Sequence, residues 1–324
     1  MRIYRTIAEL PPTSELPRTV AAIGNFDGVH RGHQEIIERV LERARILSAP
    51  AVAVTFDPHP LAVLRPELAP KLITPIAERL RLLEQTGVDA TLVIPFTREF
   101  SLQTPREFAE RVLCGALRVV EVHEGDTFRF GHDAAAGIAE LRELGAELRF
   151  TVVSHGALKV RGITVSSSEV RRRIAAGQLG VARALLGRPF SILSTQVPGR
   201  GVGKQLTTPT INLASYTELL PPNGVYVTRL RIGEGSAAPF FNAVTNAGVR
   251  PTFDGAGFAI ESHLLDGLPS IELTESTPIE VCFLMRLRDE QRFPSAALLK
   301  AQILQDVGRA QTYFRRAGSL PTDH

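Results

Sequence analysis

The sequence predicts an α/β protein in which an open parallel sheet precedes an antiparallel β-barrel and a C-terminal helix. Short apolar strands alternate with helical stretches from residue 19 to about residue 155, which is typical of a parallel sheet with crossover helices. From about residue 190 to residue 290, short strands recur with Gly, Pro, Asn and Asp turns between them, which is typical of an antiparallel barrel. A helical stretch follows the last of these strands.

The first half contains five predicted strands, at residues 19–24, 51–56, 90–96, 118–123 and 148–153. Helices are predicted between them. Residues 34–47 carry apolar side chains at positions 36, 37, 40 and 41, the spacing of one helical face. Residues 74–87 begin with Thr-Pro and stop at Gly87, and residues 104–113 open with a capping box from Thr104 to Glu107. Because open α/β sheets bind ligands at the carboxyl ends of their strands, we expect a site at that edge.

The second half contains four clear predicted strands, at residues 224–232, 239–246, 258–266 and 279–288. A final helix is predicted at about 294–316. Its apolar residues are predicted to form one stripe: Leu298, Leu299, Ile303, Leu304 and Val307. The pattern changes between residues 186 and 190 from strands alternating with helices to consecutive short strands, so we predict a first domain at 1–187 and a second at 188–324.

Composition narrows the class of protein. The 324 residues are 44% hydrophobic, and 37 basic and 34 acidic residues give a net charge of +3, too small an excess to favour nucleic-acid binding. The first 19 residues have scattered charges and no continuous apolar run, so we expect no signal peptide, no membrane association and a cytoplasmic location. Cys114 and Cys282 are expected to be reduced thiols. We expect a monomer or a weak homo-oligomer.

The stretch "IGNFDGVHRGHQ" (23–34) lies between the first predicted strand and the first predicted helix, where nucleotide phosphates bind in open α/β sheets. Gly24 and Gly28 allow the backbone to approach a ligand closely, and His30 and His33 can face the same side. The alternative is that His33 caps a helix and His30 is a solvated loop residue. "TFDPHP" (55–60) ends the second predicted strand, so His59 should emerge at the same edge.

"SSSEVRRRI" (166–174) follows the last predicted strand of the first half. The hydroxyls of Ser166, Ser167 and Ser168 suit the N-cap of a helix, and Arg171 falls on its first turn, so the segment favours phosphate binding. A capped, solvated basic helix is the alternative.

A glycine loop with basic side chains opens the second half. "PGRGVGKQLTTPTINL" (198–213) contains Gly199, Gly203 and Lys204, which can cover phosphates. Thr210 and Asn212 follow, two apart on an extended segment, so their side chains point the same way. Their oxygens suit Mg²⁺.

These segments together resemble the bacterial bifunctional riboflavin kinase and FAD synthetase family. "GNFDGVHRGHQ", "TFDPHP" and "SSSEVR" are similar to the motifs of its first domain, an adenylyltransferase of the H-x-G-H nucleotidyltransferase superfamily. "TTPTIN" is similar to the kinase signature G-F-P-T-A-N, and residues 223–230, 246–253, 260–266 and 286–293 continue the likeness. The resemblance implies a Rossmann-like parallel sheet followed by a six-stranded riboflavin-kinase-like barrel.

The resemblance also implies roles for individual residues. His30 and His33 would bind ATP phosphates and stabilise the transition state, with Asn25, Phe26 and Asp27 in the nucleotide-binding loop. Thr210 and Asn212 would bind ATP and Mg²⁺, and Glu261 would be the general base that takes a proton from riboflavin. Without the neighbouring motifs, Glu261 would be interpreted as a solvated strand carboxylate.

Three functions stay open on the sequence. The first is phosphorylation of riboflavin to FMN by ATP, followed by adenylylation of FMN to FAD with release of pyrophosphate. The second is a riboflavin kinase with a weakened adenylyltransferase domain, because Thr127 and Ala134 stand where the family has an acidic or amide residue and an arginine. The third is a non-catalytic flavin or nucleotide sensor.

Overall fold

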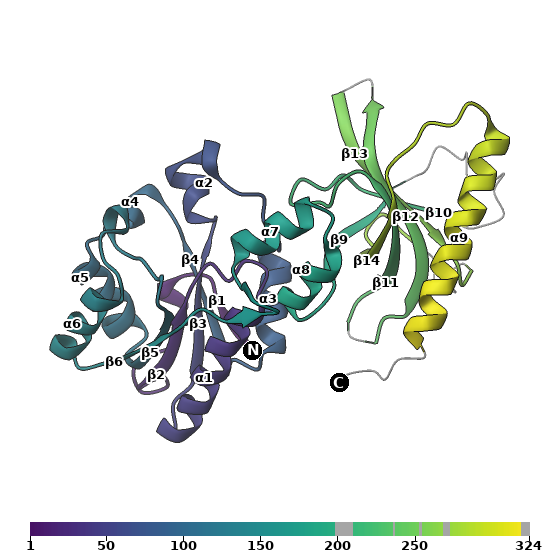
Figure 1. Cartoon of the computed structure of the whole chain (residues 1–324). Coiled ribbons are helices and arrows are strands. Elements are labelled where there is room, and N and C mark those ends of the chain that lie inside the picture. The colour runs from purple at the N-terminus through teal and green to yellow at the C-terminus, as the bar shows by residue number, and fades with distance from the viewer. Residues whose placement is uncertain (198–209, 236, 253–254, 268–272, 319–324) are drawn as a thin grey trace. The chain divides into compact units, whose positions relative to one another are not determined.

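The structure, a computed structural model, describes residues 1–197, 210–235, 237–252, 255–267 and 273–318 (Figure 1). The chain forms two compact units, Met1–Glu169 and Val170–His324. Most of α7 (Ser167–Ala175) and all of α8 (Leu179–Leu186) belong to the second unit, although we placed them in the first domain. The functional boundary at residue 187 stays a prediction.

The first unit is built on a six-stranded parallel sheet in the order β1-β4-β3-β2-β5-β6. Its strands are β1 (Arg2–Tyr4), β2 (Thr19–Ile23), β3 (Ala51–Asp57), β4 (Ala90–Pro95), β5 (Val119–Gly125) and β6 (Thr151–His155). The predicted parallel sheet is confirmed, and β1 adds a short edge strand that the sequence did not indicate. Strands β3 and β5 lie on opposite sides of β2, so the strand order reverses between β2 and β5. Open α/β sheets bind ligands at this point.

Helices cover both faces of the sheet. Side chains of α1 (Arg31–Leu47) and α3 (Ile76–Gln85) pack with the strands in one core, which includes Ile37, Val40 and Leu83. A second core on the other face contains side chains of α5 (Pro105–Phe108), η3 (Ala109–Ala116) and α6 (Ile138–Leu148). The shorter elements of the unit are η1 (Ile7–Glu9), α2 (Pro60–Leu64), η2 (Pro66–Leu68), α4 (Arg98–Ser101), η4 (His132–Ala134), β7 (Lys159–Val160) and β8 (Ile163–Thr164).

Two boundaries in the first unit differ from the prediction. Helix α1 begins at Arg31, before the expected residue 34, because the side chain of His30 caps it. The strand expected from residue 148 begins at Thr151, because Leu148 ends α6 and Arg149 takes a left-handed conformation with φ of 68°. The predicted capping box between Thr104 and Glu107 is confirmed.

The second unit contains a closed antiparallel barrel in the order β10-β13-β12-β11-β14-β9. Its strands are β9 (Phe190–Val197), β10 (Thr210–Leu213), β11 (Gly224–Ile232), β12 (Phe240–Thr252), β13 (Gly255–Leu264) and β14 (Pro278–Arg288). The predicted six-stranded barrel is confirmed, and β9 and β10 complete the four strands read from periodicity.

The final helix, α9 (Ala296–Gly318), packs against the outer face of the barrel. Only part of the predicted apolar stripe is buried: Leu298, Leu299 and Leu304 are 54%, 37% and 56% exposed. Val307 and Ala310 make the contact with the barrel instead, together with the aromatic rings that follow them. The middle and last turns of the helix therefore reach the strands, and the first turns do not.

Candidate functional site

His30 and His33 come together at the amino end of α1. The Nδ1 atom of His30 accepts a hydrogen bond from the backbone N–H of His33, at 3.3 Å, and so caps the helix. The two imidazole rings stack with their centroids 3.6 Å apart and their planes 14° apart. The two histidines therefore face the same side, as predicted. The alternative with His33 as the cap and His30 in solvent is wrong, because His30 is the cap and is buried.

A second aromatic ring contacts His33. The Phe26 ring meets it edge-on, with centroids 5.1 Å apart. Burial, reinforced by His30 and Arg79, lowers the pKa of His33 well below its ordinary value, so the ring is neutral at pH 7. Its Nδ1 atom is buried and has no hydrogen-bond partner among the described residues. A polar atom of a bound ligand would supply one.

Asp27 anchors the loop before His30 through hydrogen bonds. Its buried carboxylate accepts hydrogen bonds from the N–H groups of Ile73 and Thr74, at 3.1 and 2.9 Å, and from the Thr74 hydroxyl at 3.2 Å. The Thr74 hydroxyl in turn accepts from the N–H of Gly28, at 2.9 Å, where φ is 83°. A Cβ on Gly28 would approach Ile73 to 3.0 Å. The loop is thus fixed by the segment that leads into α3.

The serine motif lies against the same loop. Ser167 donates from its hydroxyl to the Asp27 carbonyl, at 2.9 Å, and the Ser166 hydroxyl accepts from the N–H of Glu169, which caps α7. The predicted capping role is therefore confirmed for Ser166. Ser168 lies on the first turn of α7, and Arg171 follows within the second unit.

Two further predicted residues lie at the carboxyl edge of the sheet. Gly24 directly follows β2, and a Cβ there would be 3.5 Å from the Phe26 ring. His59 follows β3 and caps α2 by accepting from the N–H of Leu61, at 3.2 Å. The Asn25 carbonyl accepts from the Thr55 hydroxyl, at 3.2 Å. The motifs on β2 and β3 thus meet at one edge, as expected.

Sequence reasoning missed a buried carboxyl group beside this edge. Glu124 lies near the end of β5, and its Oε1 atom accepts from the N–H of Ile23 at the end of β2, at 2.5 Å. Burial raises the pKa of Glu124 well above its ordinary value of 4.5, so this carboxyl group holds its proton beyond the usual range. A buried group that is less charged does not repel an anionic ligand bound between β2 and β5.

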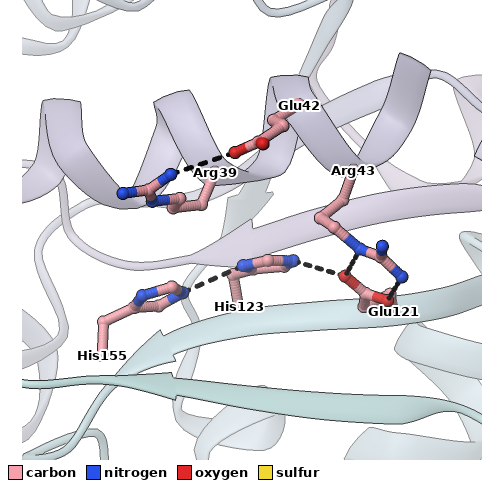
Figure 2. A network of polar contacts seen from close by, with 6 residues as sticks. All are labelled: Arg39, Glu42, Arg43, Glu121, His123 and His155. Carbon is pink, nitrogen blue, oxygen red and sulfur yellow. Dashed lines mark hydrogen bonds and ion pairs between the residues drawn. The ribbon is translucent and has the colours of Figure 1, made fainter. Parts of the chain in front are cut away.

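A line of polar side chains runs beneath α1 (Figure 2). Arg43 of α1 donates two hydrogen bonds to the Glu121 carboxylate, at 2.7 and 2.8 Å, and holds the pKa of that carboxyl below its usual range. Glu121 Oε1 is 2.7 Å from His123 Nε2, and His123 Nδ1 is 2.9 Å from His155 Nε2. Because the carboxylate accepts the Nε2 proton and burial keeps His123 neutral, His123 Nδ1 accepts from His155. These hydrogen bonds connect Arg43 of α1 with His155 at the end of β6.

The region of Thr127 and Ala134 follows β5. Arg129 donates from its guanidinium to the carbonyls of Ala134 and Ala135, at 3.0 and 3.3 Å. Ala134 itself has a positive φ of 53°. The loop that lacks the expected arginine is thus folded onto Arg129.

A second cluster of predicted residues lies on the barrel. Thr210 pairs with His263 and Asn212 pairs with Glu261 across β10 and β13, and Glu261 also pairs with Asn246 of β12. Directly paired residues share one face of a sheet, so Thr210, Asn212 and Glu261 lie on the same face. Ser262 faces the opposite way, where it is buried and hydrogen-bonds to Thr245 at 2.8 Å. The second cluster is therefore on the outer face of the barrel.

Sequence reasoning missed His263 in this cluster. Its Nδ1 atom is 3.0 Å from the Thr210 hydroxyl oxygen, and burial lowers the pKa of His263, although nearby Glu261 opposes this. A neutral imidazole that accepts the hydroxyl proton leaves the lone pairs of the Thr210 oxygen available to a cation. The side-chain oxygens of Thr210 and Asn212 are hard ligands of the kind that Mg²⁺ prefers, so these two residues would hold such an ion.

Three predicted residues cannot be placed. Gly199, Gly203 and Lys204 lie outside the described residues. Within the described residues, no group of three or more His, Cys, Asp and Glu side chains could hold a metal ion. No helix in the described part of the chain is long and apolar enough to cross a membrane.

Known proteins resemble the chain along both units. The sequence matches the FAD synthetase family over residues 13–169 and the riboflavin kinase family over residues 186–314. A bifunctional riboflavin kinase/FMN adenylyltransferase of Pseudomonas fluorescens is 38% identical over 100% of both chains. The protein of that name from Escherichia coli K12 is 35% identical over 97% of this chain and 98% of its own.

A solved structure has the same fold. The crystal structure of a macrolide-efflux protein from Streptococcus pneumoniae is 26% identical and covers 95% of this chain and 98% of its own, with a TM-score of 0.83. The combination of a parallel α/β sheet and a closed antiparallel barrel is therefore found in an experimental structure as well.

Proposed function

The chain belongs to the family of bifunctional riboflavin kinases/FMN adenylyltransferases, and we propose that it makes FMN on the barrel and FAD at the histidine loop. The observation that carries the second step is the stacked pair of His30 and His33 at the carboxyl edge of the sheet. The observation that carries the first step is the shared face of Thr210, Asn212 and Glu261.

In the first step, the riboflavin 5′-hydroxyl oxygen attacks the γ-phosphorus of ATP, and the carboxylate of Glu261 takes the proton of that hydroxyl. The bond from that phosphorus to the bridging oxygen of ADP breaks, and FMN and ADP are released. Mg²⁺, held by Thr210 and Asn212, would offset the negative charge of the phosphates. His263 supports this role, because its Nδ1 atom is 3.0 Å from the Thr210 hydroxyl oxygen, and an imidazole that accepts the hydroxyl proton there would leave the oxygen lone pairs to the ligand.

In the second step, an oxygen of the FMN phosphate attacks the α-phosphorus of a second ATP. The bond to the β-phosphate breaks, so that FAD and pyrophosphate form. We propose that the phosphates are bound by His30, His33, the N–H groups at the start of α1 and the serines of 166–168, with Asn25 and Phe26 contributing to the nucleotide site. We further propose a cytoplasmic location and a monomeric or weakly oligomeric state.

Two variants of the full chain test the assignment of each step to its unit. We expect His33→Asn to lose FAD formation from FMN and ATP by about 100-fold or more while keeping riboflavin phosphorylation, because the shorter Asn side chain does not place a donor where the imidazole ring has one. We expect Glu261→Gln to show the reverse. If either variant loses both activities while its circular dichroism is unchanged, the assignment of one step to each unit is wrong.

A further inference from the structure

Arg79 is a fully buried arginine that belongs to no sequence motif of the family resemblance. It lies on α3, is 0% exposed and ranks among the largest fully buried side chains of the described residues. An arginine is almost never fully buried unless its charge is held by specific partners, because removing the guanidinium from water is costly. Its position therefore calls for a specific role.

The guanidinium connects three segments. Arg79 Nη1 donates to the Phe56 carbonyl at 3.0 Å and to the Thr55 hydroxyl at 3.2 Å, both near the end of β3. The Thr55 hydroxyl donates to the Asn25 carbonyl at 3.2 Å, in the loop that follows β2. A single buried charge thus ties α3 to β3 and, through Thr55, to the loop that leads to the histidines.

The same loop is tied to α3 a second time. Thr74, just before α3, bonds to Asp27 and Gly28. The two ties hold the loop on both sides of Phe26, whose positive φ of 46° is one that L side chains rarely adopt. The Phe26 ring then packs edge-on against His33.

Arg79 also acts on His33 through its charge. The groups that shape the His33 environment are its stacked neighbour His30, the Phe26 ring and the Arg79 guanidinium. A fixed positive charge in a water-poor interior favours the neutral form of the imidazole and attracts nearby anions more strongly than in water.

We propose that Arg79 is a positioning residue for adenylyl transfer, which rests on the proposed function of the first unit. It ties the end of β3, through Thr55, to the loop of residues 24–30 that leads to the two histidines. ATP would then meet a loop that is already in its binding geometry, so less reorganisation is needed in the transition state.

Three full-length variants test this proposal. Arg79→Met fills nearly the same volume but has no charge and no donor, whereas Arg79→Lys keeps the charge and a donor. Arg81→Met is the matched control, because Arg81 is an arginine of the same helix that donates two hydrogen bonds to the Glu78 carboxylate. Each protein is assayed for FAD formation from FMN, for riboflavin phosphorylation and for the His33 pKa by NMR, with the signal assigned by its loss in His33→Gln.

We expect Arg79→Met to lose about 10- to 100-fold in kcat/KM for FAD formation, mostly in kcat, since small displacements of catalytic groups have effects of this size. Its His33 pKa should rise. Arg79→Lys should recover most of the rate and keep the pKa low, and Arg81→Met should match the wild type in both. A structural role alone would affect Met and Lys variants equally.

The proposal is overturned if Arg79→Met forms FAD at the wild-type rate, or if Arg79→Lys is as impaired as Arg79→Met with an unshifted His33 pKa. Should the Met variant not fold, the Lys variant decides: wild-type pKa and near-wild-type rate support the proposal, and loss of both overturns it. If the wild type itself makes no FAD, the proposed function has failed, and the His33 pKa series still tests separately whether Arg79 shapes the surroundings of His33.

Discussion

Replacement of Asp27 by Asn should destabilise the first unit strongly, although the two side chains have nearly the same size. The Asp27 carboxylate accepts three hydrogen bonds, two at Oδ1 from Thr74 and one at Oδ2 from the N–H of Ile73. An Asn amide has one acceptor oxygen, so its best orientation keeps the two bonds from Thr74 and places its NH₂ group against the Ile73 N–H.

The magnitude follows from these contacts. A buried N–H without a partner costs about 1–3 kcal/mol, and losing the charge weakens the two remaining bonds by about 1 kcal/mol in total. The sum is about 2–4 kcal/mol, which lowers the unfolding midpoint of a domain of this size by roughly 5–15 °C. FAD formation should fall with it, because Gly28 and the histidine loop depend on Thr74.

The assay is thermal unfolding of the full chain followed by circular dichroism, with residual riboflavin phosphorylation measured on the heated samples. Asp133→Asn is the matched control, because it makes the same chemical change at a side chain that is 89% exposed. An Asp27→Asn midpoint equal to that of the control would refute the reasoning that this carboxylate holds the loop. An unchanged temperature for the loss of kinase activity would locate the effect in the first unit.

Three further predictions concern the carboxyl edge and the sheet beneath it. Because burial raises the Glu124 pKa, the folded state binds an extra proton above pH 4.5, and the free energy of unfolding should fall as the pH rises from there. Urea unfolding between about pH 5 and about pH 8 should show that the free energy of unfolding depends less on pH in Glu124→Gln than in the wild type. Glu121→Gln should lose about 1–3 kcal/mol of stability in urea unfolding at neutral pH, since the charge-assisted bonds of Arg43 and His123 weaken. An unchanged stability would show that the charge of Glu121 contributes nothing net. Thr127→Asp should leave the rate of FAD formation within about threefold, because the groups that we propose to bind phosphate lie elsewhere. A rise of about tenfold, or 1.4 kcal/mol, would instead support a weakened native adenylyltransferase.

The sequence predicted those parts of the fold that depend on local pattern. The strand periodicity located the parallel sheet, and the position of the motifs after strands placed His30, His33 and His59 at one edge. The alternation of side chains on an extended segment correctly put Thr210 and Asn212 on one face. These inferences hold because periodicity and strand ends constrain backbone geometry directly.

Other features depend on contacts between distant segments, and local pattern gave no sign of them. Arg79 lies in a helix whose charged residues would ordinarily face solvent, and its burial is set by Thr55 and Phe56. Glu124 similarly lies in a strand, and its burial is explained by its hydrogen bond with the end of the neighbouring strand β2. The leucines of α9 show the converse: they are apolar but exposed, because an apolar side chain is buried only where a partner surface contacts it.

The central claim, that one chain carries both flavin steps, is tested most directly by incubating the full-length protein with riboflavin, ATP and Mg²⁺ and separating the products by chromatography over time. The account predicts that FMN appears first and FAD follows, with ADP and pyrophosphate as the two by-products. FMN without FAD would contradict the assignment of adenylyl transfer to the histidine loop, and neither product, with ATP and FMN still bound, would identify a sensor in place of an enzyme.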